Sequence, residues 1–217
     1  MNSNTKKILW ISSGIAFSLV LLYGVYRIVR RKVTAKSPFR RKTIRIANEE
    51  LDIWDGGKRK ETESSMYPVI KKYWESIGWN ENQWNVGTAW SSAFISYVMK
   101  KANANEDDFK FASKHSSYIT KAIANRKQNA KKGFKGYRLN EKKVELGDLV
   151  CYARQDGITY DTTGDYYSHC DLIVEIDGDN AIGVGGNVSN SVSKKKIPLV
   201  DGFAKEGNRR FVVIKTK

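Results

Sequence analysis

Two polar residues of this 217-residue chain occupy positions from which an acyl-transfer reaction could be carried out. Ser91 lies in the first turn of the helix that the apolar spacing of AWSSAFISYVMKKA predicts, with Thr88 as the expected N-cap. His169 begins the predicted strand HCDLIVEI and shares its polar face with Asp171. A serine hydroxyl needs a general base to become a nucleophile, and histidine suits that role. From the spacing alone, a capping or hydrogen-bonding serine is the favoured interpretation of Ser91, and a surface histidine is the alternative for His169.

The elements that must position these residues change in kind along the chain. From residue 64 the apolar spacing is helical, and KHSSYITKAIANRKQNA predicts a third helix capped by Ser116 or Ser117. From Val144 onward, alternating apolar and polar residues predict strands separated by polar turns. Helices followed by antiparallel strands indicate an α+β fold, with helices packed on one face of a curled sheet.

Five motifs in order, WSSAF, HSSYI, GDLVCY, SHCD and GGNV, resemble the papain-like fold of bacterial cell-wall peptidases. The similarity is to the NlpC-type endopeptidases and the CHAP amidases, and most to a bacterial branch catalogued as a domain of unknown function. It covers about residues 64–214. The resemblance implies that Ser91 occupies the position of the nucleophilic cysteine and that His169 is the catalytic histidine. Asn187 or Asp171 would then orient the imidazole.

The same resemblance implies a peptidoglycan hydrolase of the peptidase or amidase kind that uses no cofactor. Serine at the cysteine position departs from the family, because a hydroxyl does not ionise as a thiol beside imidazole does. The alternative is therefore an inactive papain-like module that binds a cell-wall peptide or a protein partner. Residues expected to contact the substrate are Trp90, His115, Tyr152 and Arg154, and the guanidinium of Arg154 suits a carboxylate. No spacing of Cys and His residues predicts a metal site.

The N-terminal region indicates a membrane protein. Residues 8–26, ILWISSGIAFSLVLLYGVY, contain no charged residue and are long enough to cross the hydrocarbon core of a bilayer. We therefore expect a short tail over residues 1–7 and an uncleaved transmembrane helix over residues 8–29. A basic juxtamembrane linker over residues 30–63 follows, suited to anionic lipids, and the papain-like domain is expected over residues 64–217.

The distribution of charge bears on partner and location. The formal net charge is +15, and residues 1–60 contain 14 Lys and Arg against 4 Asp and Glu, so the excess favours a membrane surface over nucleic acid. More basic residues follow the expected span than precede it, which favours a cytoplasmic domain. A peptidoglycan substrate instead requires a periplasmic or extracellular domain, and we prefer that location. Cys151 and Cys170 are expected on strand faces away from His169, as buried thiols or as a cross-strand disulfide.

Overall fold

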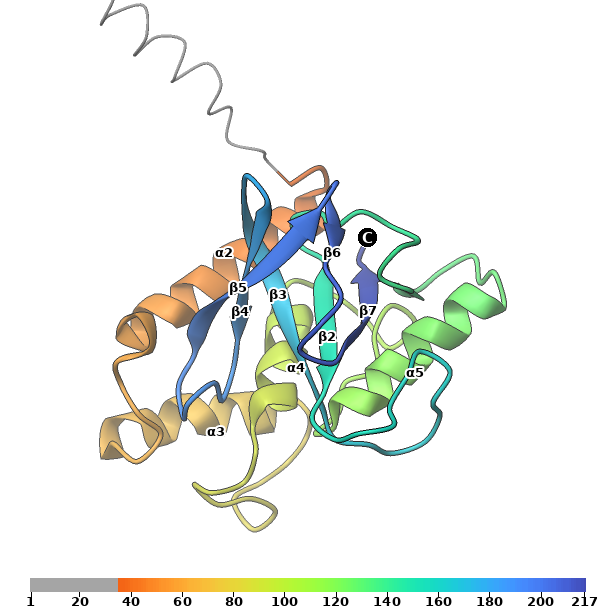
Figure 1. The fold of residues 1–217 in the computed structure, drawn as a ribbon. Helices are drawn as coiled ribbons and strands as arrows, with labels where there is room; N and C mark the ends of the chain where they lie inside the picture. Colours follow the sequence, from red (N-terminus) through yellow and green to blue (C-terminus); the bar gives the residue numbers. More distant parts are fainter. Residues whose placement is uncertain (1–34) are drawn as a thin grey trace, which may run out of the picture. The chain divides into compact units, whose positions relative to one another are not determined.

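Helices form the first half of residues 35–217 and strands the second half in the computed structural model, which describes this part of the chain (Figure 1). The helices are α2 (Pro38–Ile53), α3 (Tyr67–Glu75), α4 (Ser91–Lys101) and α5 (His115–Lys127), with short 3-10 turns at Asp55–Gly57 and Ser64–Met66. The strands are β1 (Lys135–Tyr137), β2 (Leu149–Ala153), β3 (Ser168–Asp177), β4 (Asn180–Gly185), β5 (Ser193–Val200), β6 (Phe203–Ala204) and β7 (Arg210–Lys215).

The predicted transmembrane helix over residues 8–29 lies outside the described residues. Within residues 35–217, no helix combines the length and apolar character needed to cross a bilayer.

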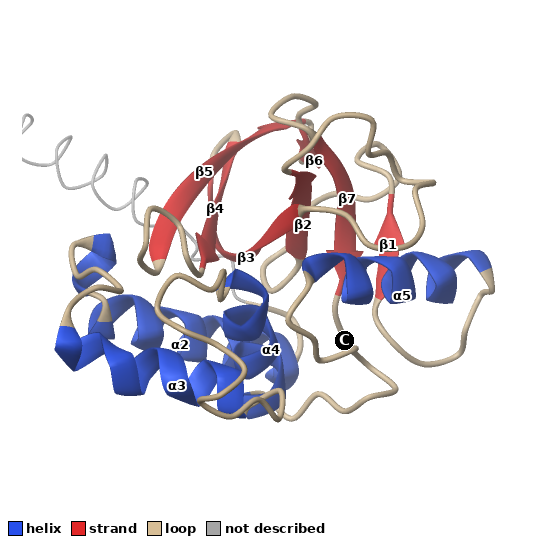
Figure 2. Cartoon of the chain, turned by 90° about the horizontal axis from the view of Figure 1, so that it is seen from below, coloured by secondary structure: helices blue, strands red, loops and turns tan. Residues whose placement is uncertain are grey.

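The strands form one antiparallel sheet in the order β1-β7-β2-β3-β4-β5-β6. The sheet is strongly curled, and the four helices lie on one side of it (Figure 2). Irregular register in β2, between Cys151 and Tyr152, and in β3, between Ile173 and Glu175, adds local bending. The predicted α+β class, with helices on a curled antiparallel sheet, is confirmed.

Alternation of side chains along the sheet separates the core into two clusters. Leu149 and Leu172 pack with the helices, and α4 is the central one, with its apolar side chains buried on nearly every side. Val150 and Ile173, one position along each strand, belong to a second cluster on the opposite face of the sheet. The two clusters therefore lie on opposite faces of the sheet.

The domain begins earlier than the sequence predicted, because α2 is part of it. The predicted linker over residues 30–63 is wrong for most of its length, since the compact unit runs from Thr34 to Lys217. Ser37 caps α2 by accepting a hydrogen bond from the backbone of Arg40, and Pro38 occupies the first helical turn. Trp54, directly after the helix, is fully buried in the cluster that contains α4.

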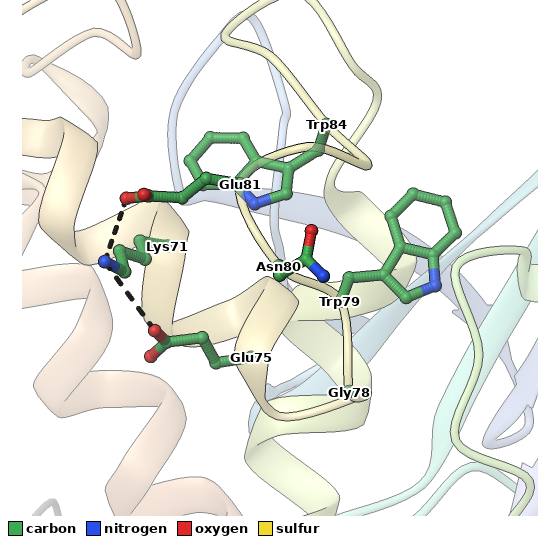
Figure 3. A pocket seen from close by; sticks show the side chains of 7 residues that line it. All are labelled: Lys71, Glu75, Gly78, Trp79, Asn80, Glu81 and Trp84. Atoms are coloured by element: carbon green, nitrogen blue, oxygen red, sulfur yellow. Dashed lines mark ion pairs between the residues drawn. The ribbon is translucent and has the colours of Figure 1, made fainter.

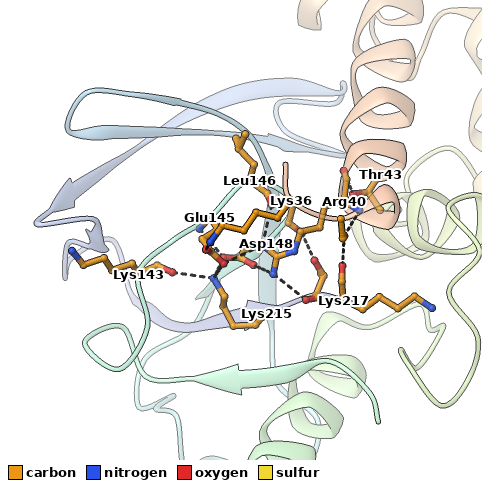
Figure 4. Close-up of polar contacts among 12 residues, drawn as sticks. Lys36, Arg40, Thr43, Lys143, Glu145, Leu146, Asp148, Lys215 and Lys217 are labelled. Carbon is orange, nitrogen blue, oxygen red and sulfur yellow. Dashed lines mark hydrogen bonds and ion pairs between the residues drawn. The ribbon is translucent and has the colours of Figure 1, made fainter. Parts of the chain in front are cut away.

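Arg40, on α2, contacts residues at the end of the sheet through ion pairs and hydrogen bonds (Figure 4). Its guanidinium lies 3.0 Å from Oδ1 of Asp148 and 3.3 Å from Oε2 of Glu145, and it donates to the carbonyl of Leu146 at 3.1 Å. Lys215, on β7, pairs with the carboxylates of both Glu145 and Asp148. Asp148 is fully buried, and burial raises its pKa against the pull of these two cations. A buried carboxylate held by two cations makes this junction sensitive to the loss of either cation.

The exposed member of this network predicts a pH dependence of stability. Lys36 and Lys215 lower the pKa of Glu145 from 4.5 to about 2. A lowered pKa contributes stability above the unfolded pKa, and this contribution is lost as the pH falls from 4.5 toward 2. Because 38% of the Glu145 side chain is exposed, we expect Glu145→Gln to cost only about 1 kcal/mol near neutral pH.

Urea unfolding at a series of pH values checks this expectation. The difference between Glu145→Gln and the parent chain should fall to less than half by about pH 3. Glu49→Gln, in the exposed pair with Arg45, is the matched control and should change stability little at any pH. A difference for Glu145→Gln that does not vary with pH would contradict the assignment.

Candidate functional site

A cavity of about 640 Å³ opens where the first turns of α4 and α5 face the loop of residues 154–167, which joins β2 to β3. Its wall includes Ser91, His115, Arg154, Tyr166, Tyr167 and Ser168. Tyr167 is 78% exposed at the rim, whereas Tyr166 is buried. The cavity therefore combines a candidate nucleophile, an imidazole and a cation within one enclosure of ligand size.

A second cavity, of about 340 Å³, lies between the end of α3 and the loop that follows it (Figure 3). Trp79 and Trp84 contribute aromatic walls, and Lys71 is held 2.8 Å from Glu81 and 3.9 Å from Glu75. The charged groups of this cavity thus satisfy one another, and its wall has no serine, cysteine or histidine. The cavity beside Ser91 is the better candidate for chemistry.

Ser91 pairs with His115. Its Oγ lies 2.7 Å from Nε2 of His115, and the two residues begin α4 and α5, so the contact joins two helix starts. The predicted cap Thr88 is wrong, because Trp90 is the N-cap residue and its side chain makes no capping hydrogen bond. Ser91 is thus the first helical residue, with its hydroxyl free for His115.

The start of α5 differs from the prediction in the same way. Lys114 is its N-cap residue, in place of Ser116 or Ser117, and makes no side-chain capping bond. His115 is therefore the first residue of the helix, and its imidazole points to Ser91 instead of capping the backbone.

The environment of His115 suits a neutral general base. Its Nδ1 hydrogen-bonds the hydroxyl of Tyr118, one turn further along α5. Burial lowers the pKa of His115 well below 6.5, and the proximity of the second imidazole, His169, and of the Arg154 guanidinium lowers it further. Burial also raises the pKa of Tyr118 well above 10, so this hydroxyl stays protonated. With the ring proton on Nδ1, toward Tyr118, Nε2 can accept the proton of Ser91.

His169 belongs to a neighbouring polar pair. Its Nε2 lies 3.0 Å from Oδ1 of Asp171, and Nη2 of Arg154 lies 3.1 Å from its Nδ1. Because a guanidinium can only donate hydrogen bonds, Nδ1 of His169 is the acceptor. Nε2 therefore carries the ring proton and donates a hydrogen bond to Asp171. The His169 ring is fully buried, with its centroid 5.1 Å from that of His115. The structure places His115, instead of the predicted His169, against Ser91.

Three further predicted site residues lie away from the cavity wall. Asn187 sits in the turn after β4 with a φ of 53° and makes no hydrogen bond to His169, so Asp171 is the orienting partner. Trp90 is fully buried and stacks on Trp54, which makes it a core residue. The Tyr152 ring lies 5.1 Å from that of His169 and is not among the residues of the cavity wall. Arg154 is in the wall, as predicted.

The two glycines of the GGNV motif, Gly185 and Gly186, allow close packing beside the site. A Cβ added at Gly185 would lie 2.2 Å from Oδ1 of Asp171 and 2.7 Å from Nε2 of His169. A Cβ added at Gly186 would lie 2.5 Å from that of Phe94, on α4. A side chain at either position would displace the imidazole pair or the central helix. From the sequence, Asn187 was the residue of this motif expected to have a role in the site. The structure instead gives a reason for the two glycines before it, because neither position has room for a side chain.

Cys151 and Cys170 form a disulfide between β2 and β3, which resolves the two alternatives left open by the sequence. Both are fully buried in the cluster shared with the helices, on the strand faces opposite His169, as predicted. The bridge therefore joins the strands directly behind the site.

Two residues of the site were missed from the sequence. Tyr118 follows His115 at a helical spacing of three, which places both on one helix face and could have identified it. Ser168 lines the cavity with a buried hydroxyl that has no partner among the described residues. No group of three His, Cys, Asp or Glu side chains within residues 35–217 is placed to hold a metal ion.

Fold and site together define an α+β domain with a buried Ser–His pair at the junction of two helix starts. The family model described as "Uncharacterized protein conserved in bacteria (DUF2272)" matches residues 52–208, and the chain belongs to this family. The predicted relation to a bacterial domain of unknown function is confirmed. No curated protein and no solved structure matches the chain significantly.

Proposed function

We propose that this domain is a serine hydrolase of peptide or amide bonds in which Ser91 is the nucleophile and His115 the general base. The main support is the 2.7 Å contact between Ser91 Oγ and His115 Nε2 in the wall of a ligand-sized cavity. The low pKa of His115 keeps its imidazole neutral at physiological pH, the form that a base requires. The motif order and the curled sheet support a papain-like relation, with the base supplied by α5.

The reaction uses these groups in two steps. Ser91 Oγ attacks the carbonyl carbon while its proton passes to His115 Nε2, and that proton then goes to the leaving nitrogen as the C–N bond breaks. The product is an acyl-enzyme ester and a free amine. Water attacks the ester, gives one proton to His115, and releases a carboxylic acid as the proton returns to Ser91.

Charge on the carbonyl oxygen would be stabilised at the start of α4. The first amide groups of a helix have no intrahelical acceptors, and no side chain of the N-cap residue Trp90 occupies them. These amides lie beside the attacking hydroxyl, because Ser91 is itself the first helical residue. They are the natural donors for an oxyanion in this arrangement.

Peptidoglycan stem peptides are the proposed substrate class, following the motif resemblance. The buried Cys151–Cys170 disulfide supports a location outside the cytoplasm, since such bonds persist in oxidising compartments. A single membrane span over residues 8–29, with its basic flank on anionic lipids, would hold the domain near the cell wall.

A fluorophosphonate probe tests the activated serine without a known substrate. Attack by Ser91 on phosphorus releases fluoride and leaves a stable adduct, which mass spectrometry would locate on the Ser91 peptide. We expect adduct formation with the native chain and none with Ser91→Ala or with heat-denatured protein. The rate should be constant near neutral pH and fall only below pH 6.5, as His115 becomes protonated.

Absence of the adduct in the native chain would contradict the hydrolase proposal. Binding of stem peptides by the same unreactive protein would then favour the alternative, a binding module with the same cavity.

A further inference from the structure

We propose that Arg154, Ser168 and the first turn of α5 form a carboxylate-binding subsite in the cavity beside Ser91. As an inference about substrate it rests on the proposed function: the bond cleaved would lie near a free carboxylate of the substrate. As an inference about binding it rests only on the geometry of the wall.

Arg154 supplies a cation that is held in place and not neutralised. One of its five N–H groups donates to His169, which fixes the guanidinium at the cavity wall. Among residues 35–217, no carboxylate lies within ion-pair distance of it. Asp165 is the acidic residue of the wall, and it pairs with Lys114. The remaining N–H groups of Arg154 thus match the fork geometry of an incoming carboxylate.

Ser168 supplies a hydroxyl that lacks a partner. The residue is only 8% exposed, its Oγ has no hydrogen bond in the described structure, and it lines the same cavity as Arg154. Buried hydroxyls are nearly always hydrogen-bonded, so this unpartnered hydroxyl, which belongs to a residue of the cavity wall, can take a ligand atom as its partner.

The first turn of α5 adds a favourable field. This 13-residue helix has no side-chain cap and no acidic residue in its first turn, and its N-cap residue is the basic Lys114. Free amide groups and the positive end of the helix dipole favour an anion at this end. Arg154 and the start of α5 therefore both favour negative charge, and Ser168 adds a neutral hydrogen-bonding group. The one acidic residue of this cavity wall, Asp165, is already paired with Lys114.

The test compares two probes that differ only in charge, N-acetyl-dialanine and its C-terminal amide. Binding is measured by calorimetry or NMR titration on the full chain carrying Ser91→Ala, so that the result does not depend on turnover. We expect the acid to bind about tenfold tighter than the amide, as charge-assisted hydrogen bonds predict. Inorganic phosphate, as a third probe, should bind more weakly than the acid.

Variants assign the preference to its residues. Adding Arg154→Gln should remove most of the preference for the acid, Arg154→Lys should restore part of it, and Ser168→Ala should weaken binding of the acid a few-fold. Arg45→Gln removes the same charge from the exposed face of α2 and should leave the preference unchanged. Equal binding of acid and amide, a preference that Arg154→Gln leaves undiminished, tighter binding of phosphate, or no binding at millimolar concentration would each overturn the proposal.

These titrations use the Ser91→Ala chain and measure binding only. If fluorophosphonate labelling fails, the hydrolase proposal is contradicted, but the carboxylate subsite is still tested by the titrations. Labelling with equal binding of acid and amide would instead retain the hydrolase and remove the subsite.

Discussion

Ser91→Ala and His115→Ala are each expected to lower kcat/KM for hydrolysis by about a thousandfold or more, because each removes half of the unit that generates the nucleophile. The double variant should be scarcely worse than either single one, since groups that act together have non-additive effects. A p-nitrophenyl ester gives the rate directly, and release of soluble fragments from purified peptidoglycan tests the proposed substrate.

His169→Ala separates the observed geometry from the one that the motif resemblance implies. If His115 is the base, loss of His169 frees Arg154 and Asp171 and should lower kcat/KM by only about tenfold, the scale of lost positioning. If His169→Ala were as damaging as Ser91→Ala while His115→Ala stayed active, the base would be His169 and the Ser91–His115 contact would be structural.

Ser91→Cys addresses the departure from the cysteine families. Activity that is absent in the parent and present only in Ser91→Cys would mean that the cleft is intact and its nucleophile replaced. The protein would then be a binding module.

The part of the fold that depends on local pattern was predictable from the sequence. In β3, strict alternation placed Cys170 and Leu172 on one face and His169 and Asp171 on the other, and the strand register and core cluster agree. His169 and Asp171 are nevertheless as fully buried as their apolar neighbours, so the predicted polar face is not a solvent-facing one. The helix around Ser91 was likewise evident from its apolar spacing. Both features are properties of a few consecutive residues, and neither needs knowledge of distant contacts.

The Ser91–His115 pair could not be predicted in this way. It depends on how the starts of two helices, 24 residues apart, meet beside the sheet. The true first residues of α4 and α5 also differed from the expected caps, and a shift of two positions turns a helical side chain by about 200°. Resemblance supplied His169 as the base because that residue begins the matching strand, yet both of its ring nitrogens are occupied.

The helix α2 escaped the sequence analysis for a physical reason. Arg40 and Glu50 are buried charged residues, so the segment reads as polar, and only the structure shows the partners that satisfy them. Charged side chains are rarely buried unless paired, and a single sequence does not show such pairing.

Deletion of this helix is expected to have the largest effect on stability of any change discussed. A chain of residues 64–217, which the predicted boundary would have suggested, should fail to show a cooperative unfolding transition. Removing residues 35–63 exposes the core that Ile46, Leu51 and Trp54 cover. At about 1.5–3 kcal/mol for each large apolar side chain, the loss approaches the whole stability of a typical domain.

Polar contacts add to the cost of this deletion. The Tyr73 hydroxyl would lose both the carboxylate of Glu50, at 2.5 Å, and the indole N–H of Trp54, at 3.0 Å. At the other end of the helix, the buried Asp148 would lose Arg40 and keep only Lys215, and breaking one side of a buried ion pair typically costs about 3–5 kcal/mol.

The matched control is residues 34–217, which removes the N-terminal segment but keeps α2. Thermal and urea unfolding, followed by circular dichroism, should show a single sharp transition for this chain and none for residues 64–217. A cooperative transition of equal midpoint in both would mean that α2 is an accessory. If the expectation holds, an inactive preparation of residues 64–217 would say nothing about Ser91, because its helix α4 would have lost the core that fixes the Ser91–His115 contact.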